Sequence, residues 1–254
     1  MELPPVGLGT MGIDDPDVVA TALEVGYRHL DTAQIYDNET VVGEGIARSD
    51  VPRSELTVAT KVWADSLSPE AVRRSTDESL ERLGLETIDL LYVHRPIDTY
   101  DPERTLPAFD ALRTNGLIEH VGLSNFSVAE LETARSILEA PIAAHQIEFH
   151  PLFQSPELLA HARDHGYPVV AYSPLAGGRV RDLESVCAVA DRHDTTPEAV
   201  ALAWVLAHDG VRAIPKASSR DHLEANLSAT DIDLEAADVA AIDGIDRTEE
   251  LFPE

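Results

Sequence analysis

The sequence predicts an α/β fold of the (β/α)8 TIM-barrel type, with parallel strands and one extra helix near the C-terminus. Short apolar runs alternate with longer segments of helical periodicity along the whole chain. Eight strand-then-helix pairs imply a parallel sheet, and closure into a barrel is its simplest arrangement. The 254 residues suit a single barrel domain spanning 1–254, because such barrels run to about 250 residues.

The expected strands are the short apolar runs, which in chain order are Val6–Gly9, Tyr27–Leu30, Leu56–Thr60, Ile88–Val93, His120–Leu123, Ala144–Glu148, Val169–Ala171 and Val211–Ile214. The expected helices are the amphipathic segments, which are Asp17–Val25, Glu39–Ala47, Pro69–Leu83, Thr105–Asn115, Val128–Leu138, Pro156–His165, Leu183–Arg192 and Pro197–His208. A last helix over Leu234–Ile245 lies outside the eight units and should cap one face of the barrel.

Three of these helices carry a start signal. Ser68, Ser155 and Thr196 each precede a proline, so each is an N-cap candidate followed by proline at the first helical position. A doubly wound open sheet is the competing fold, and periodicity does not exclude it. Its phosphate-binding GxGxxG turn is missing, because the glycines of the segment GLGTMG after the first strand have the wrong spacing.

The composition is strongly acidic, with 19 basic and 46 acidic residues and a net charge of -27. This charge argues against nucleic acid or an anionic membrane as a partner. It predicts a salt-adapted protein, because concentrated salt screens such self-repulsion. Lys61 and Lys216 are the only lysines of the chain, and we expect each to have a specific role.

The single cysteine, Cys187, allows no intramolecular disulfide, which favours a reducing compartment. Met1 to Thr10 does not resemble an export signal, and the longest apolar stretch, Ala199 to Ala207, is too short for a membrane span. We therefore expect a cytoplasmic protein.

Ionisable residues stand at the ends of three successive predicted strands. Asp31 follows the second strand, Lys61 the third and His94 the fourth, and Tyr36 lies in the loop after Asp31. In a barrel these positions point into the mouth where catalysis is found. Singly, each could be structural: a turn cap, an ion pair or a core histidine. Together they predict a catalytic group.

These four residue types suit the reduction of a carbonyl. Hydride attack builds an alkoxide, which needs a proton donor and hydrogen-bond donors near the oxygen. Free tyrosine has a pKa of about 10, and we expect the Lys61 ammonium to lower the pKa of Tyr36. Asp31 would keep Lys61 charged and oriented, and His94 would bind the carbonyl oxygen.

Three segments around these residues resemble the aldo-keto reductase family. They are DTAQIYDNE from Asp31, ATKVW around Lys61 and LLYVH ending at His94. The resemblance extends over nearly the whole chain and implies that Asp31, Tyr36, Lys61 and His94 are the catalytic residues. It also implies a small-molecule aldehyde or ketone as substrate and NADPH or NADH as the hydride source.

Further segments resemble the coenzyme-binding motifs of that family, namely VGLSNF, QIEFHP, AYSPL and IPK. By this resemblance, Ser124, Asn125 and Gln146 bind the nicotinamide carboxamide, Tyr172 stacks on the nicotinamide, and Lys216 contacts the 2′-phosphate or the pyrophosphate. The remaining coenzyme residues that it implies are Thr10, Met11, Ser173, Leu175, Ile214, Ser218, His222 and Asn226.

Departures from the family pattern concern the coenzyme first. Ala217, His222 and Ala225 replace the usual serine, arginine and glutamate of the last motif. An imidazole suits a phosphate less well than a guanidinium does, although Arg220 could compensate. NADPH is favoured over NADH only slightly.

Other departures concern the substrate pocket, for which Met11, Trp63 and Arg95 are the candidates. Met11 and Arg95 stand where tryptophan is common, and Trp63 keeps the expected aromatic. Arg95 either pairs with Asp98 or favours polar and anionic carbonyls. Little sequence precedes the first strand or follows Leu251, and the loops after strands four and seven are short, so we expect an open pocket of weak selectivity.

Two other functions are weighed. One is a non-catalytic nicotinamide-binding sensor or regulatory subunit on the same fold. The other is a metal-dependent barrel, for which His145, His150, His161 and His165 are the possible ligands. We expect these four to be surface or loop residues that do not converge, and no metal site. A monomer or weak oligomer is expected.

Overall fold

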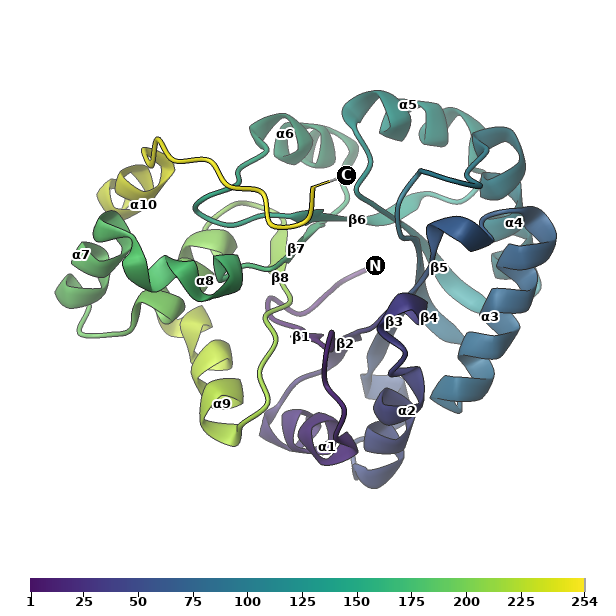
Figure 1. The fold of residues 1–254 in the computed structure, drawn as a ribbon, viewed down its shortest axis with the longest axis horizontal. Coiled ribbons are helices and arrows are strands. Elements are labelled where there is room, and N and C mark those ends of the chain that lie inside the picture. The colour runs from purple at the N-terminus through teal and green to yellow at the C-terminus, as the bar shows by residue number, and fades with distance from the viewer. Residues whose placement is uncertain (254) are drawn as a thin grey trace.

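The computed structural model describes residues 1–253, and its eight strands run parallel in the order β1 to β8 (Figure 1). A parallel bridge between Val6 and Ala213 joins the two ends of the sheet. Backbone hydrogen bonds support this junction, from Gly7 N to Ala213 O (2.8 Å) and from Ala213 N to Pro5 O (2.9 Å). The predicted (β/α)8 barrel is confirmed.

The strands are β1 (Leu8–Gly9), β2 (His29–Asp31), β3 (Thr57–Val62), β4 (Ile88–Val93), β5 (Ile118–Ser124), β6 (Ile142–Glu148), β7 (Val169–Tyr172) and β8 (Val211–Ala213). Only β4 has the predicted bounds. The other strands differ by one or more residues at one or both ends, since pairing with both neighbours decides where a strand begins and ends. Tyr27 lies before β2, buried, with its hydroxyl donating to Leu223 O (3.1 Å).

The helices are α1 (Pro16–Val25), α2 (Glu39–Arg48), α3 (Pro69–Leu83), α4 (Pro102–Thr114), α5 (Val128–Ile137), α6 (Pro156–His165), α7 (Glu184–Arg192), α8 (Pro197–Leu206), α9 (Arg220–Ser228) and α10 (Ala236–Asp243). The sequence did not predict α9, which completes the eighth strand-helix unit. It buries only Leu223 and Asn226, too few for a clear helical pattern. Among the helices that the structure describes, none combines the length and apolar character of a membrane span.

The three predicted N-caps differ in outcome. Thr196 accepts a hydrogen bond from Ala199 N, as predicted. Ser68 and Ser155 occupy the N-cap positions of α3 and α6 with proline following, but neither side chain makes a cap hydrogen bond. The fixed φ angle of proline still favours a helix start at those two positions.

Two apolar cores hold the barrel together. The larger lies between the sheet and the surrounding helices. The smaller fills the barrel and includes Leu3, Leu90, Tyr92 and Val170. Gly122 lets the Tyr92 ring approach β5, because a Cβ at Gly122 would lie 2.4 Å from Tyr92 Cδ1. With the interior packed, the polar residues at the strand ends are left to form a site at the mouth.

Candidate active site

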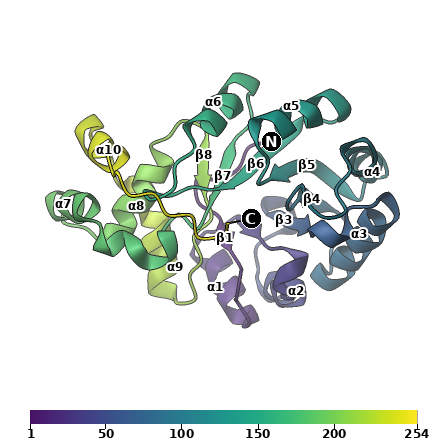
Figure 2. The same cartoon turned by 45° about the horizontal axis from the view of Figure 1, so that its top comes forward.

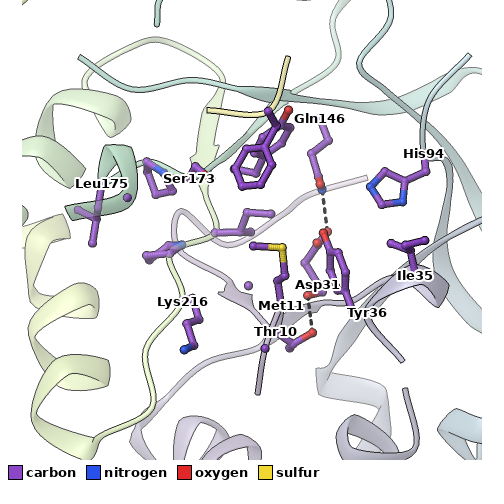
Figure 3. Close-up of a pocket in the computed structure, with 18 of the residues that line it drawn as sticks. Thr10, Met11, Asp31, Ile35, Tyr36, His94, Gln146, Ser173, Leu175 and Lys216 are labelled. Atoms are coloured by element: carbon purple, nitrogen blue, oxygen red, sulfur yellow. Dashed lines mark hydrogen bonds between the residues drawn. The ribbon is translucent and has the colours of Figure 1, made fainter. Parts of the chain in front are cut away.

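A cavity of about 720 Å³ opens at the carboxyl ends of the strands (Figure 3). Most of the residues predicted for the site line it, namely Thr10, Met11, Asp31, Tyr36, Trp63, His94, Arg95, Asn125, Gln146, Tyr172, Ser173, Leu175, Ile214 and Lys216. Lys61 and Ser124 are buried and are not part of the lining.

A buried ion pair lies at the base of the cavity. The Lys61 ammonium contacts Asp31 Oδ1, and it also donates to Thr32 O (2.7 Å). Gln146 Nε2 donates to the other carboxylate oxygen, Asp31 Oδ2 (2.7 Å), as Figure 3 shows. Burial is the largest single effect and lowers the pKa of Lys61, but the interactions with Asp31 and Tyr36 together outweigh it, and the pKa ends above its ordinary value. Lys61 is therefore an ammonium at neutral pH.

Tyr36 lies in a short 3-10 helix, η1 (Gln34–Tyr36), in the connection that the sequence predicted to be helix-free. The Gln34 side chain anchors this turn by donating to Ser75 O (2.9 Å) and accepting from Trp63 N (3.2 Å). The Lys61 ammonium lies 5.3 Å from the centre of the Tyr36 ring. The sequence contained no signal for this anchoring role of Gln34.

The expected net lowering of the Tyr36 pKa is wrong. Burial raises the pKa of Tyr36, and although the Lys61 charge lowers it as predicted, the net result is a raised pKa. Desolvation disfavours a phenolate more than one ammonium stabilises it here. Tyr36 therefore keeps its proton at neutral pH, as a proton donor must.

His94 follows β4 and is only 8% exposed. Its ring packs edge-on against Trp63, with centroids 4.8 Å apart, and against Tyr36, with centroids 6.1 Å apart. Burial, with the Lys61 and Arg95 charges, lowers the pKa of His94 to about 2. The imidazole is therefore neutral and can donate one hydrogen bond to an oxygen in the cavity.

The residues predicted to hold the nicotinamide are linked to one another. Tyr172 donates from its hydroxyl to Asn125 Oδ1 (2.9 Å). Asn125 Nδ2 donates to His94 O (2.9 Å) and to Ser124 Oγ (3.1 Å). Asn125 has the left-handed φ of 61°, which asparagine tolerates better than most residues. These bonds link the Tyr172 hydroxyl, through Asn125, to the backbone of His94.

The residues predicted for the phosphates lie on the opposite side of the cavity. Lys216 and Leu175 are far from His94 in Figure 3, and Lys216 is exposed. Ser218 and His222 are also exposed and do not line the cavity. Asn226 is buried and does not line the cavity either.

Arg220, the suggested substitute for the missing arginine, is held by two carboxylates. Its Nη2 lies 2.6 Å from Glu24 Oε2, and its Nη1 lies 3.5 Å from Glu224 Oε1. Both ion pairs are exposed, so each contributes little to stability. They nevertheless compete with a phosphate for the guanidinium.

Two glycines in the cavity wall were missed by the sequence analysis. Gly177 and Gly178 lie in the 3-10 segment η4 (Ala176–Asp182) with φ angles of 62° and 88°, a region that favours glycine. The Gly-Gly pair is itself a turn signal and could have identified this wall. A Cβ at Gly178 would meet no atom within 4 Å, so its backbone is open to a ligand.

The C-terminal segment also reaches the cavity, although, as noted from the sequence, little follows Leu251. Phe252 lines the cavity, and its ring lies 5.9 Å from that of Tyr172 in an edge-on arrangement. The segment crosses the barrel mouth as the yellow ribbon of Figures 1 and 2. Phe252 therefore adds to the wall of a pocket that the sequence predicted to be open.

Glu148, at the end of β6, holds this segment in place. Its buried carboxylate accepts the backbone N–H of Leu251 (2.7 Å) and of Phe252 (3.1 Å), and lies 2.8 Å from His150 Nε2. Arg95 Nη2 donates to Phe252 O (3.0 Å), a different partner from the Asp98 considered above. The sequence did not reveal that these residues fix the tail.

The four histidines considered as metal ligands are not surface or loop residues as a group. His145 and His150 are fully buried and His161 is 8% exposed. His161 and His165 converge with Glu132, with one ligand atom of each within 4.8 Å of the others. The expectation that none of these histidines converge is wrong for this pair.

Comparisons with known proteins give one consistent result. The Aldo/keto reductase family pattern matches residues 5–247. Methylglyoxal reductase DkgB of Escherichia coli O157:H7 is 39% identical, over 99% of this chain and 96% of that protein. Glyoxal reductase of Bacillus subtilis (strain 168) is 35% identical, over 100% of this chain and 92% of that protein. A solved structure of a putative 2,5-diketo-D-gluconic acid reductase B has a TM-score of 0.95 at 33% identity, over 99% of this chain and 92% of that one.

Proposed function

Since the chain belongs to the aldo/keto reductase family and is an oxidoreductase that reduces carbonyls with a nicotinamide coenzyme, we propose that Tyr36, Lys61, Asp31 and His94 carry this reaction on small aldehydes. The observation that carries the proposal is the buried Lys61–Asp31 pair beside the protonated Tyr36. No comparison favours the alternative of a non-catalytic sensor.

The cavity has the features that a nicotinamide dinucleotide requires. It extends from His94 past the Tyr172 ring to the glycine wall at Gly178 and the cation Lys216, which suits a flat ring at one end and phosphates at the other. Asn125 and Gln146, which line the cavity, would bind the carboxamide, and Ser124 would act through the Asn125 amide from which it accepts (3.1 Å). Thr10, Met11, Ser173, Leu175 and Ile214 would surround the rest. The bound coenzyme supplies the hydride.

Each catalytic side chain then has one task. Tyr36 donates its hydroxyl proton to the oxygen that becomes the alcohol, and Lys61 stabilises the phenolate left behind. Asp31, held by Gln146 Nε2 at 2.7 Å, keeps Lys61 charged. Neutral His94 donates a hydrogen bond to the same carbonyl oxygen as charge develops on it.

We propose small 2-oxoaldehydes, such as methylglyoxal and glyoxal, as substrates. The names of two relatives support this class, and so does a pocket whose walls include Trp63, Met11 and Phe252. NADPH would be favoured over NADH, because Lys216 lines the end of the cavity proposed for the phosphates. The preference would be slight, because Arg220 is held by Glu24.

The test is the variant Tyr36→Phe, which removes only the hydroxyl. We expect kcat for methylglyoxal to fall by about 10²–10⁴-fold, the usual contribution of a positioned proton donor, with the coenzyme dissociation constant unchanged. Tyr100→Phe is the matched control, because Tyr100 is packed against Phe126 outside the cavity. Turnover of Tyr36→Phe at the wild-type rate would contradict the mechanism.

We also propose that residues 1–254 act as one cytoplasmic barrel domain, as a monomer or weak oligomer. The single Cys187 supports the compartment. The large apolar side chains exposed within residues 1–253 are Met1, Met11, Ile35 and Ile97, of which Met11 and Ile35 line the cavity. This leaves little apolar surface for a permanent interface.

Finally, we propose that the protein is adapted to high salt, on the basis of its net charge of -27. The unfolding midpoint should rise steeply from low to molar KCl, as the Debye length shrinks to about 3 Å at 1 M. A midpoint that does not change with KCl would refute the adaptation and leave the reductase assignment intact.

A further inference from the structure

Three side chains converge on the outer face of the barrel, on the neighbouring helices α5 and α6 of Figure 1. His161 and His165 are one helical turn apart on α6, and Glu132 lies on α5. Glu132 Oε1 is 2.7 Å from His161 Nε2 and 3.2 Å from His165 Nε2. Two imidazoles and one carboxylate converging from adjacent turns form a ligand set typical of zinc.

The imidazole of His161 is oriented by a second contact, at its other ring nitrogen. His161 Nδ1 lies 2.6 Å from the Tyr167 hydroxyl, which fixes the ring while Nε2 faces Glu132. Partners of this kind on the other ring nitrogen commonly orient metal-binding histidines. His165 Nε2 lies 3.2 Å from Arg135 Nη1, so the guanidinium stands beside the same nitrogen that faces Glu132 Oε1.

Arg135 provides the positive charge of the cluster. Its Nη1 also donates to both oxygens of Glu132, at 2.9 and 3.1 Å. One cationic nitrogen thus contacts the carboxylate of Glu132 and Nε2 of His165, two of the three groups that would bind a metal. The Arg135 side chain is 37% exposed and can move into solvent.

We propose that Glu132, His161 and His165 form a Zn²⁺ site in which the metal replaces the Arg135 guanidinium. His161 coordinates the ion through Nε2 while the Tyr167 hydroxyl holds Nδ1, and His165 Nε2 and Glu132 Oε1 supply the other two protein ligands. Water fills the fourth position of the tetrahedron.

The site lies outside the cavity described above, and a metal bound there would link α5 and α6. A metal that binds the folded chain and not the unfolded chain stabilises the fold in proportion to its occupancy. The proposal is independent of the reductase mechanism, because none of its residues lines the cavity.

The experiment is calorimetric titration of untagged protein with ZnCl₂ in 0.5 M KCl, which screens weak binding to the acidic surface. The titration is repeated with the Cys187→Ser variant, in which no thiol can bind zinc. We expect one Zn²⁺ per chain and no saturable binding of MgCl₂, since Mg²⁺ prefers oxygen ligands. Zinc should also raise the unfolding midpoint.

Variants separate this site from adventitious binding. His165→Ala should abolish the one-to-one binding, Tyr167→Phe should weaken it by about tenfold, and Arg135→Ala should strengthen it. His165→Ala should keep wild-type carbonyl reduction, which shows that it folds. Equal zinc affinity in wild type and His165→Ala, or no gain in Arg135→Ala, would overturn the proposal.

Discussion

The two sides of the cavity differ in how firmly their ionisable groups are held. On the catalytic side, Asp31, Lys61 and His94 are at most 8% exposed, and Asp31 and Lys61 are held by hydrogen bonds to buried partners. On the coenzyme-phosphate side, Lys216, Ser218 and His222 are exposed, and Arg220 is engaged by surface carboxylates.

This difference has a physical cause. A buried charge without a partner is very costly, so each buried group requires its partners. An exposed charge is solvated by water, and its contacts contribute little free energy. Substitutions on the catalytic side should therefore change kcat and stability strongly. Substitutions on the coenzyme-phosphate side should change coenzyme affinity slightly.

The largest effect on stability and on kcat is expected from Lys61→Met. Lys216→Met, on the other side of the cavity, is the variant with which it is compared. Lys61→Met leaves Asp31 buried without its cation, a loss of about 3–5 kcal/mol of stability. It also removes the charge that lowers the pKa of Tyr36, so kcat should fall by about 10² or more. Urea unfolding and steady-state kinetics measure both changes.

Lys216→Met changes the same residue type on the other side. It should fold with wild-type stability, keep kcat and raise only the KM for coenzyme. Equal losses of stability in the two variants would show that burial does not distinguish the two sides.

A smaller effect is expected from Glu24→Gln, which weakens the hold on Arg220. The freed guanidinium should lower the KM for NADPH a few-fold and leave the KM for NADH unchanged, because only NADPH carries the 2′-phosphate. His222→Arg should act in the same direction. The difference should shrink in 1 M KCl, where the Debye length is about 3 Å. If neither variant distinguishes the two coenzymes, this surface does not face the phosphate.

The smallest effect is expected when the pH is changed near neutrality and the rate of carbonyl reduction is measured. With a pKa of about 2, His94 is neutral throughout the working range, and the raised pKa of Tyr36 keeps the proton donor loaded. The rate should therefore be flat across pH 6 to 7, where a free histidine titrates at about 6.5, and fall only in strongly alkaline solution as Tyr36 loses its proton. An inflection near neutral pH that His94→Asn removes would contradict this.

Much of the fold was predictable because the apolar periodicity of strands and helices is local. The barrel class and β4 were found in this way, whereas α9 was missed because it buries only Leu223 and Asn226. The clustering of the proposed catalytic residues was predictable because strand ends meet at one rim of a barrel. Phe252 and Glu148 were missed because their contact spans 104 residues of sequence.

The sequence by itself determined the order of strands and helices, the acidic surface and the four residue types at the mouth, since these depend on composition and short-range spacing. Only the tertiary structure decided the net pKa of Tyr36, the hold of Glu24 on Arg220, the tether of the tail to Glu148 and the convergence of Glu132 with His161 and His165. Each of these depends on burial or on distances between segments far apart in the chain, which short-range sequence patterns do not contain.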